Sequence, residues 1–143
     1  MNRYLLDTNI VSNIVKPQPS EALLEWMAAQ RDLDLYIAGL TLAEIRRGIL
    51  QMPFGRKRDS LQAWYAGSEG PPALFRGRVL AFDEAAAEAW AEIMAHGVKI
   101  GAPHSALDMI IAAVAHANAC VVVTDNERHF QNVVEFLNPT RST

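Results

Sequence analysis

Four acidic residues in widely separated parts of the chain have the types and settings needed for metal-dependent chemistry. Asp7 and Asp125 each follow a short apolar run typical of a buried strand, whereas Glu44 and Asp108 each stand near the start of an expected helix. Carboxylates crowded at one edge of a fold repel each other, and a bound divalent cation relieves that repulsion. Oxygen ligands without a Cys or His cluster favour Mg²⁺, or Mn²⁺, over Zn²⁺. Such ions promote phosphodiester hydrolysis.

Each of these acids also has a purely structural interpretation. Asp is a favoured helix N-cap, and a helix is expected directly after Asp7. Thr41-Leu42-Ala43-Glu44 and Ser105-Ala106-Leu107-Asp108 both match the capping box, in which the acid returns to the backbone N–H of the cap residue. Capping boxes are common, so no single acid decides between the two interpretations. The metal hypothesis requires that the acids meet in one place.

The rest of the chain supplies elements that would bring the acids together. Apolar runs predict strands, and helical periodicity with capping signals predicts helices between them. Alternating strands and helices predict an α/β fold, with a parallel sheet covered by helices on both faces. Ligands bind such sheets outside the carboxyl ends of the strands, where Asp7 and Asp125 fall. The expected strands are 4–7, 35–38, 78–82, 120–124 and 133–136, and the expected helices are 8–15, one after Ser20, 41–52, 58–66, 83–96 and 105–118, with loops at 53–57, 67–72 and 97–104.

Length and composition indicate one globular domain. The chain has 143 residues, of which 50% are hydrophobic and 20% charged, so we expect one domain over 1–138 and a loose tail over 139–143. The formal net charge of -3 does not by itself indicate a nucleic-acid binder. A local basic patch could still serve a nuclease.

Cysteine usage and the apolar stretches predict a cytoplasmic protein. Cys120 is the single cysteine and lies in an apolar run, which excludes an internal disulfide and fits a reducing compartment. The apolar run before Asp7 is too short for a signal peptide. The longest apolar stretch, 106–124, is interrupted by polar residues, so we expect no membrane span.

The remaining polar residues are less informative. The four histidines show no metal-binding spacing, and a scattered His is more often a surface residue than a ligand. A basic set is usually solvated surface, but it could hold RNA phosphates if it lines the acidic pocket. The four histidines are His96, His104, His116 and His129, and the basic set is Arg46, Arg47, Arg56, Lys57, Arg58, Arg76 and Arg78.

Several stretches also follow, in order and spacing, the motifs of a known family. The first is Leu5-Leu6-Asp7-Thr8-Asn9, and the others are 35–48 around Glu44, 77–83, 106–115 around Asp108, 124–130 and 136–139. Together they resemble the PIN domains, and especially the VapC and FitB-like toxins of bacterial toxin–antitoxin pairs. The resemblance covers nearly the whole chain.

That resemblance implies a PIN-like fold, with a parallel sheet of about five strands sandwiched between helices. It implies a Mg²⁺-dependent endoribonuclease that acts as the toxin of a type II pair, with Asp7, Glu44 and Asp108 as metal ligands. Asn9, Arg46 and Arg47 are the candidate RNA contacts. It further implies a homodimer held inactive by a cognate antitoxin, which inserts a segment into the active site and carries the DNA-binding part.

The fourth motif departs from the family. Relatives usually place a polar residue two positions after the threonine, which here is Asn126, while Asp125 occupies a position that is often basic or neutral in relatives. Because side chains alternate at the end of a strand, only one of the two faces the site easily. Both are therefore candidate catalytic residues.

Two other interpretations compete with the nuclease. A haloacid-dehalogenase-type phosphatase also begins with a strand ending in Asp, but it needs a second Asp where this chain has Asn9, and room for a cap domain. A catalytically weak PIN-fold binding module, working through an antitoxin-type partner, would use the acids only as helix caps.

Overall fold

Five short strands form one parallel sheet in the computed structural model, which describes residues 2–141. Their order across the sheet is β3-β2-β1-β4-β5, and each neighbouring pair runs in the same direction. The predicted α/β fold with about five parallel strands is therefore confirmed. The strands are β1 (Tyr4–Leu6), β2 (Leu35–Ala38), β3 (Val79–Leu80), β4 (Val121–Val123) and β5 (Phe136–Leu137).

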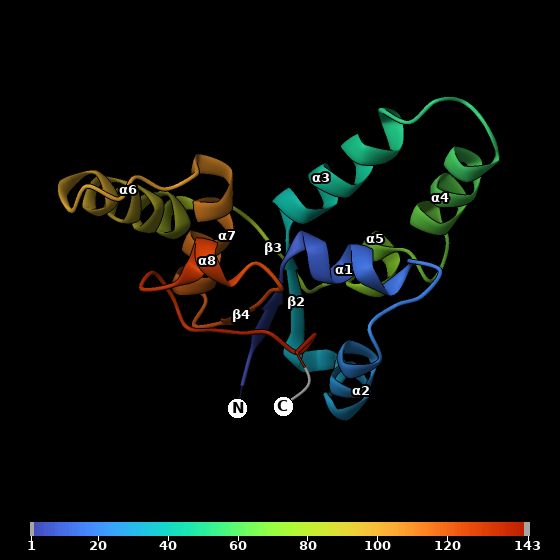
Figure 1. Ribbon diagram of the computed structural model, residues 1–143, viewed down its shortest axis with the longest axis horizontal. Coiled ribbons are helices and arrows are strands. Elements are labelled where there is room, and N and C mark those ends of the chain that lie inside the picture. Colours follow the sequence, from blue (N-terminus) through green and yellow to red (C-terminus); the bar gives the residue numbers. More distant parts are fainter. Residues whose placement is uncertain (1, 142–143) are drawn as a thin grey trace.

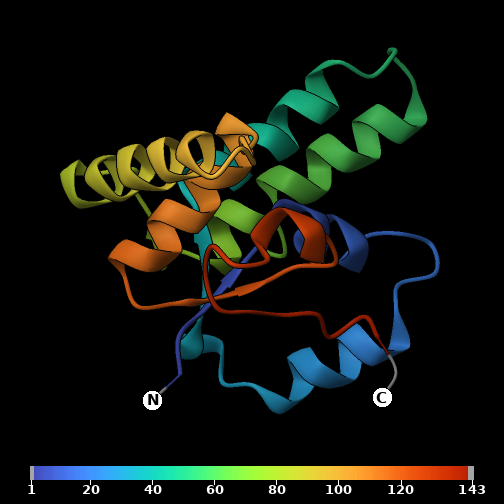
Figure 2. The ribbon, with the colours of Figure 1, turned by 60° about the vertical axis from the view of Figure 1, so that its left-hand side comes forward.

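Helices connect the strands and cover both faces of the sheet (Figures 1 and 2). In Figure 1, α6, α7 and α8 lie on one side of the strands, and α1, α3, α4 and α5 lie on the other, with α3 and α4 projecting as a hairpin. The helices are α1 (Thr8–Ile14), α2 (Glu21–Ala29), the 3₁₀ turn η1 (Asp32–Asp34), α3 (Gly39–Leu50), α4 (Arg56–Ala66), α5 (Pro71–Leu74), α6 (Glu84–Lys99), α7 (Ala106–Ala117) and α8 (Glu127–Phe130).

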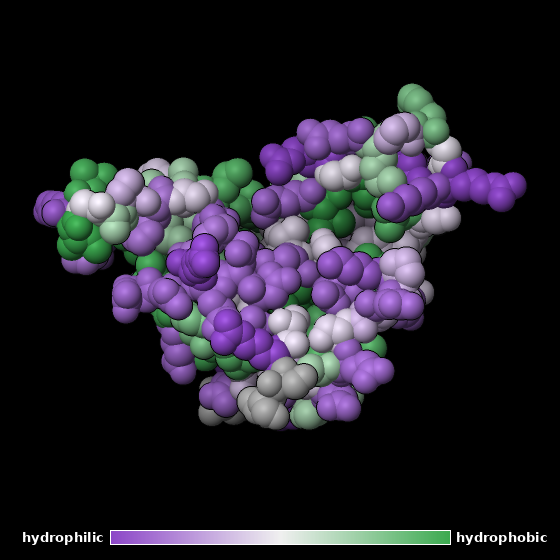
Figure 3. Space-filling model, in the orientation of Figure 1, coloured by the Kyte–Doolittle hydropathy of each residue, from purple (hydrophilic) through white to green (hydrophobic). Residues whose placement is uncertain are grey.

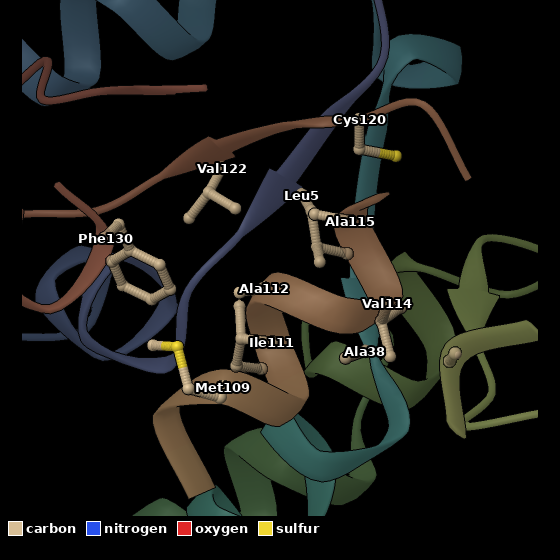
Figure 4. Close-up of a cluster of buried hydrophobic side chains, with 11 residues drawn as sticks. Leu5, Ala38, Met109, Ile111, Ala112, Val114, Ala115, Cys120, Val122 and Phe130 are labelled. Carbon is tan, nitrogen blue, oxygen red and sulfur yellow. The ribbon is translucent and has the colours of Figure 1, made fainter. Parts of the chain in front are cut away.

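The side chains of the central strands alternate between two apolar layers. Leu5 and Val122 point into a layer shared with the buried face of α7 (Figure 4). Leu6 and Val123 point into the opposite layer, which contains residues of α1 and α3. Successive side chains of a strand point to opposite faces. A strand buried on both faces therefore appears in the sequence as a continuous apolar run, as β1 and β4 do.

β1 stands where the order of the strands reverses. From β1 the chain builds β2 and β3 on one side of the sheet, and it later returns to β4 and β5 on the other. Leu6 pairs with Val123 of β4, and the backbone N–H of Asp7 donates to the carbonyl of Val123 at 2.9 Å. In open α/β sheets, ligands bind outside the carboxyl ends of the strands at such a reversal. The carboxyl end of β1 is thus the expected position of a site.

Some element boundaries differ from the prediction. α3 begins at Gly39 rather than Thr41, and the last strand lies at 136–137 rather than 133–136. The helices α5 and α8 were not predicted. Both have four residues, too few for a periodic apolar signal. α5 begins with Pro71, whose fixed φ suits the first turn of a helix.

The C-terminal segment contacts the domain as far as Arg141. Pro139 is buried, and the guanidinium of Arg141 pairs with the carboxylate of Glu127. This part of the expected tail therefore packs on the domain, whereas 142–143 lie outside the described residues. Within 2–141, every helix is too short or too polar to cross a membrane.

Candidate active site

Asp7 lies at the carboxyl end of β1 and caps the N-terminus of α1. Its Oδ1 accepts a 2.8 Å hydrogen bond from the backbone N–H of Thr8, so the N-cap interpretation is correct as far as it goes. Its Oδ2 accepts from the hydroxyl of Thr124 at 2.9 Å and from the side-chain amide of Asn9 at 3.2 Å. The two oxygens are therefore fixed by donors from α1 and from the end of β4, well beyond what a helix cap requires.

Asp7 is under the electrostatic influence of two other acids. Burial raises the pKa of Asp7 above its ordinary value, the hydrogen bonds from Thr124 and Thr8 oppose this rise, and the charges of Asp108 and Glu44 add to it. Glu44 and Asp108 come from α3 and α7, on opposite sides of the sheet (Figure 1). Carboxylates from three elements thus share one electrostatic environment, as the metal hypothesis requires.

Glu44 is not part of a capping box. Because α3 begins at Gly39, Thr41 lies inside the helix, where it is fully buried. The carboxylate of Glu44 accepts a 2.8 Å hydrogen bond from the hydroxyl of Thr8, and the hydroxyl of Thr41 lies 3.3 Å from that of Thr8. The capping-box interpretation of Glu44 is therefore wrong. Its side chain faces α1 and the end of β1.

Asp108 has a local and a distant partner. Ser105 caps α7, and its hydroxyl accepts from the backbone N–H of Asp108 at 3.5 Å. This is one of the two hydrogen bonds of a capping box. The carboxylate of Asp108 instead contacts α8, where His129 Nδ1 lies 2.9 Å from its Oδ2. The acidic side chain is thus directed away from its own helix end.

Asp125 and Asn126 connect to the site through their backbones. Both side chains are exposed. The N–H of Asp125 donates to Asn9 Oδ1 at 3.4 Å, and the N–H of Asn126 donates to Thr124 Oγ1 at 2.9 Å. The backbone of 125–126 therefore donates to Asn9 and Thr124, the two side chains that donate to Asp7 Oδ2. Thr124, which was not a candidate site residue, is fully buried and is the central residue of this network. Its signals in the sequence were its place at the end of an apolar strand and at the start of the fourth motif.

The candidate RNA contacts lie in different environments. Asn9 donates to Asp7 and accepts from the backbone of Asp125, so it belongs to the hydrogen-bond network of the site. Arg46 stacks over the ring of Tyr65, 5.8 Å from its centre, on the side of α3 that faces α4 and α5. Arg47 is exposed in the last turn of α3. An RNA-contact role for the two arginines stays a prediction.

The donor set fits a hard cation that keeps part of its water shell. Within 2–141, no three His, Cys, Asp or Glu side chains stand close enough to form a ready-made metal cluster. Mg²⁺ seldom uses such a cage, because it binds one or two carboxylates and completes its octahedron with waters and substrate phosphates. Separate carboxylates around one edge, with Thr and Asn oxygens nearby, match this chemistry. They do not match the N/S ligand set of structural Zn²⁺.

An apolar cavity of about 320 Å³ opens beside Glu44, between α1, α3 and α4. Figure 3 shows the corresponding hydrophobic surface near α3 and α4, next to the hydrophilic middle of the same face. Thr8 and Glu44 belong to both the cavity and the acidic site. The other lining residues are Ser12, Val15, Lys16, Pro17, Ile45, Gly48, Ile49, Met52, Lys57, Leu61 and Trp64.

Fold and site together define a PIN-domain protein: an open parallel sheet with carboxylates gathered at the end of its central strand. The chain belongs to the PIN domain family, which matches residues 4–135, and within it to the VapC and FitB-like group.

The chain is similar to named proteins over almost its whole length. It is 38% identical to the VapC ribonuclease Y4jK of Sinorhizobium fredii, covering 94% of this chain and 96% of the relative. It is 37% identical to the plasmid stability protein StbB of Pseudomonas syringae, covering 89% and 90%. Among solved structures, FitAB bound to a DNA fragment matches with a TM-score of 0.90 and 33% identity, over 98% of this chain and 97% of the other.

Proposed function

We propose that this protein is a metal-dependent endoribonuclease that hydrolyses RNA phosphodiester bonds and acts as the toxin of a type II toxin–antitoxin pair. The proposal rests on the buried Asp7, whose pKa is raised by the charges of Glu44 and Asp108 from two other elements, and on the hydrogen bond that each of the three carboxylates accepts from elsewhere in the fold. The similarity to a VapC ribonuclease over nearly the full length supports the reaction type.

Asp7, Glu44 and Asp108 would hold Mg²⁺ or Mn²⁺. When bound, such an ion lowers the pKa of a water ligand and stabilises the charge on the leaving oxygen. The residues of this chain supply the positions of the ligand oxygens. A ligating carboxylate must be ionised, and the hydrogen bonds from Thr8 and Thr124 favour the ionised form of Asp7 against its burial.

The alternative of a binding module without catalysis is less well supported. It requires the acids to act only as helix caps. Glu44 has no capping role, because α3 begins before Thr41, and the side chain of Asp108 contacts α8. The phosphatase alternative is excluded by the family, since the chain is a PIN domain.

The partner we propose is a cognate antitoxin, by analogy with the FitAB complex on DNA. The apolar cavity between α1, α3 and α4 would accept an apolar segment of such a partner, which would then end beside Glu44 and obstruct the acidic site. DNA would be contacted only through the antitoxin. We further expect a homodimer that acts in the cytoplasm on cellular RNA.

Cleavage of bulk tRNA by the purified protein tests the nuclease proposal. We expect cleavage with Mg²⁺, none with EDTA, and loss of activity in Asp7→Asn and Asp108→Ala. Glu92→Gln, an exposed acid on α6, is the matched control and should cleave like the wild type. Cleavage that persists in EDTA, or full activity of Asp108→Ala, would contradict the proposal. Growth arrest on expression, relieved by co-expression of a small protein encoded next to this chain, tests the toxin assignment.

A further inference from the structure

One of the four histidines stands at the acidic site. His129 lies on α8, and its Nδ1 is 2.9 Å from Oδ2 of Asp108. Because an ionised carboxylate can only accept, Nδ1 is the donor. Both side chains are partly exposed, His129 at 43% and Asp108 at 34%. The contact therefore lies at the rim of the site, where a metal ligand must remain reachable by substrate.

The fold holds His129 in this position from both sides. Before it, the backbone N–H of Asn126 donates to Thr124 Oγ1, the same hydroxyl that donates to Asp7. After it, Phe130 is buried in the apolar layer beneath α7 (Figure 4). The turn is closed by the N–H of His129 donating to the carbonyl of Asn126 at 3.1 Å. The imidazole is thus presented to Asp108 by a segment anchored at two points.

We infer that His129 is a positioning residue for Asp108, and this inference rests on the proposed metal-dependent function. Its Nδ1–H holds Oδ2, so Oδ1 would be available to hold the cation. This role requires a hydrogen on Nδ1 and no particular charge on the ring. Ligating carboxylates are commonly held by such outer hydrogen bonds, and losing one typically costs roughly 10- to 100-fold in metal affinity or activity.

The other two acids are arranged in the same way. Thr124 donates to Asp7, and Thr8 donates to Glu44. Each carboxylate therefore accepts a hydrogen bond from a side chain of another element, although both oxygens of Asp7 are engaged. His129 completes this pattern, because it does for Asp108 what the two threonines do for the other acids.

The test compares two substitutions of nearly equal shape. Asn at position 129 places an amide N–H near the position of Nδ1, whereas Leu has similar size and no donor. His116→Leu, an exposed histidine on α7, is the matched control. For each variant we would measure Mn²⁺ binding to the metal-free protein by calorimetry, the Mg²⁺ concentration that gives half-maximal cleavage, and the thermal midpoint.

We expect His129→Leu to raise the Mn²⁺ dissociation constant and the half-maximal Mg²⁺ concentration by about 10-fold. This is the lower limit of the usual range for such hydrogen bonds, because the pair is partly exposed. His129→Asn should recover most of that loss, and His116→Leu should behave like the wild type. The inference is overturned if His129→Leu binds Mn²⁺ like the wild type. It is also overturned if Asn is no better than Leu, since the contact would then only join α7 to α8.

A reference variant separates this inference from the proposed function. If Asp108→Ala retains both Mn²⁺ binding and cleavage, the proposed function is wrong. If Asp108→Ala loses both while His129→Leu loses neither, the proposed function stands and only the role of His129 is removed.

Discussion

The hydroxyl of Thr124 donates to Oδ2 of Asp7 across 2.9 Å and joins residues 117 positions apart in the chain. These residues follow β4 and β1, which are neighbours in the sheet. Thr124 is fully buried, and its oxygen also accepts from the backbone N–H of Asn126. One hydroxyl thus connects the acid at the end of β1 to the segment that begins α8.

Thr124→Val should lower both stability and activity. Valine keeps the shape but removes the donor to Asp7 and leaves the N–H of Asn126 without its acceptor. A buried polar group left without a partner costs about 1–3 kcal/mol, so the free energy of unfolding in urea should fall by an amount of that order. Thr124→Ser retains the hydroxyl and should restore most of the cleavage rate. A valine variant as stable and active as the wild type would show that this hydroxyl is not needed.

Asp7→Asn should not destabilise the metal-free protein at neutral pH. Burial raises the pKa of Asp7 in the folded state, so above that pKa the charged carboxylate opposes folding. As pH falls from the raised pKa towards the ordinary pKa of Asp, the folded state takes up the proton first and the free energy of unfolding of the wild type rises. Any stability advantage of Asn over Asp should therefore be largest at neutral pH and shrink on acidification. Urea denaturation in EDTA between neutral and acidic pH measures this, and an advantage that grows on acidification would contradict it.

Divalent cations should reverse that order of stability. A ligand that binds only the folded state stabilises it by mass action. Millimolar Mn²⁺ should therefore raise the thermal midpoint of the wild type, and EDTA should remove this gain. Asp7→Asn should show little response, while Glu92→Gln should respond like the wild type. An equal Mn²⁺ response in Asp7→Asn and the wild type would place the cation elsewhere.

Thr8→Val should impair cleavage through Glu44. The Thr8 hydroxyl is 2.8 Å from the Glu44 carboxylate, whereas the N–H of Thr8 that donates to Asp7 is unchanged by the substitution. We therefore expect a lower cleavage rate at saturating Mg²⁺. Thr8→Ser, which keeps the hydroxyl, should remain close to the wild type. Equal rates for Val and Ser would show that Glu44 does not depend on this contact.

Asp125→Asn should reduce cleavage far less than Asp7→Asn does. The side chain of Asp125 is exposed, and the charges that raise the pKa of Asp7 are those of Asp108 and Glu44. Parallel measurement of Asn126→Ala would then show whether the second position after Thr124 supplies the fourth group. A loss in Asp125→Asn as large as that in Asp7→Asn would assign the role to Asp125 instead.

Much of this protein was determined by local sequence. Strands buried on both faces are continuous apolar runs, so β1, β2 and β4 could be predicted, and acids at the ends of β1 and β4 follow from the same runs. Because all strands are parallel, their carboxyl ends must share one edge. The position of Asp7 at a site therefore followed from the sequence alone.

Only the tertiary structure decided what each acid contacts. A capping box is a local signal worth about 1 kcal/mol. In α3 the burial of Thr41, Ile45 and Ile49 outweighs this contribution. The helix therefore begins before Thr41, and the side chain of Glu44 contacts Thr8. A four-residue helix has no stability of its own, so α8 exists because Phe130 is buried. Packing alone therefore brings His129 to Asp108. Glu44 and Thr8, like Asp108 and His129, are distant along the chain. A local sequence pattern therefore cannot predict that they come into contact.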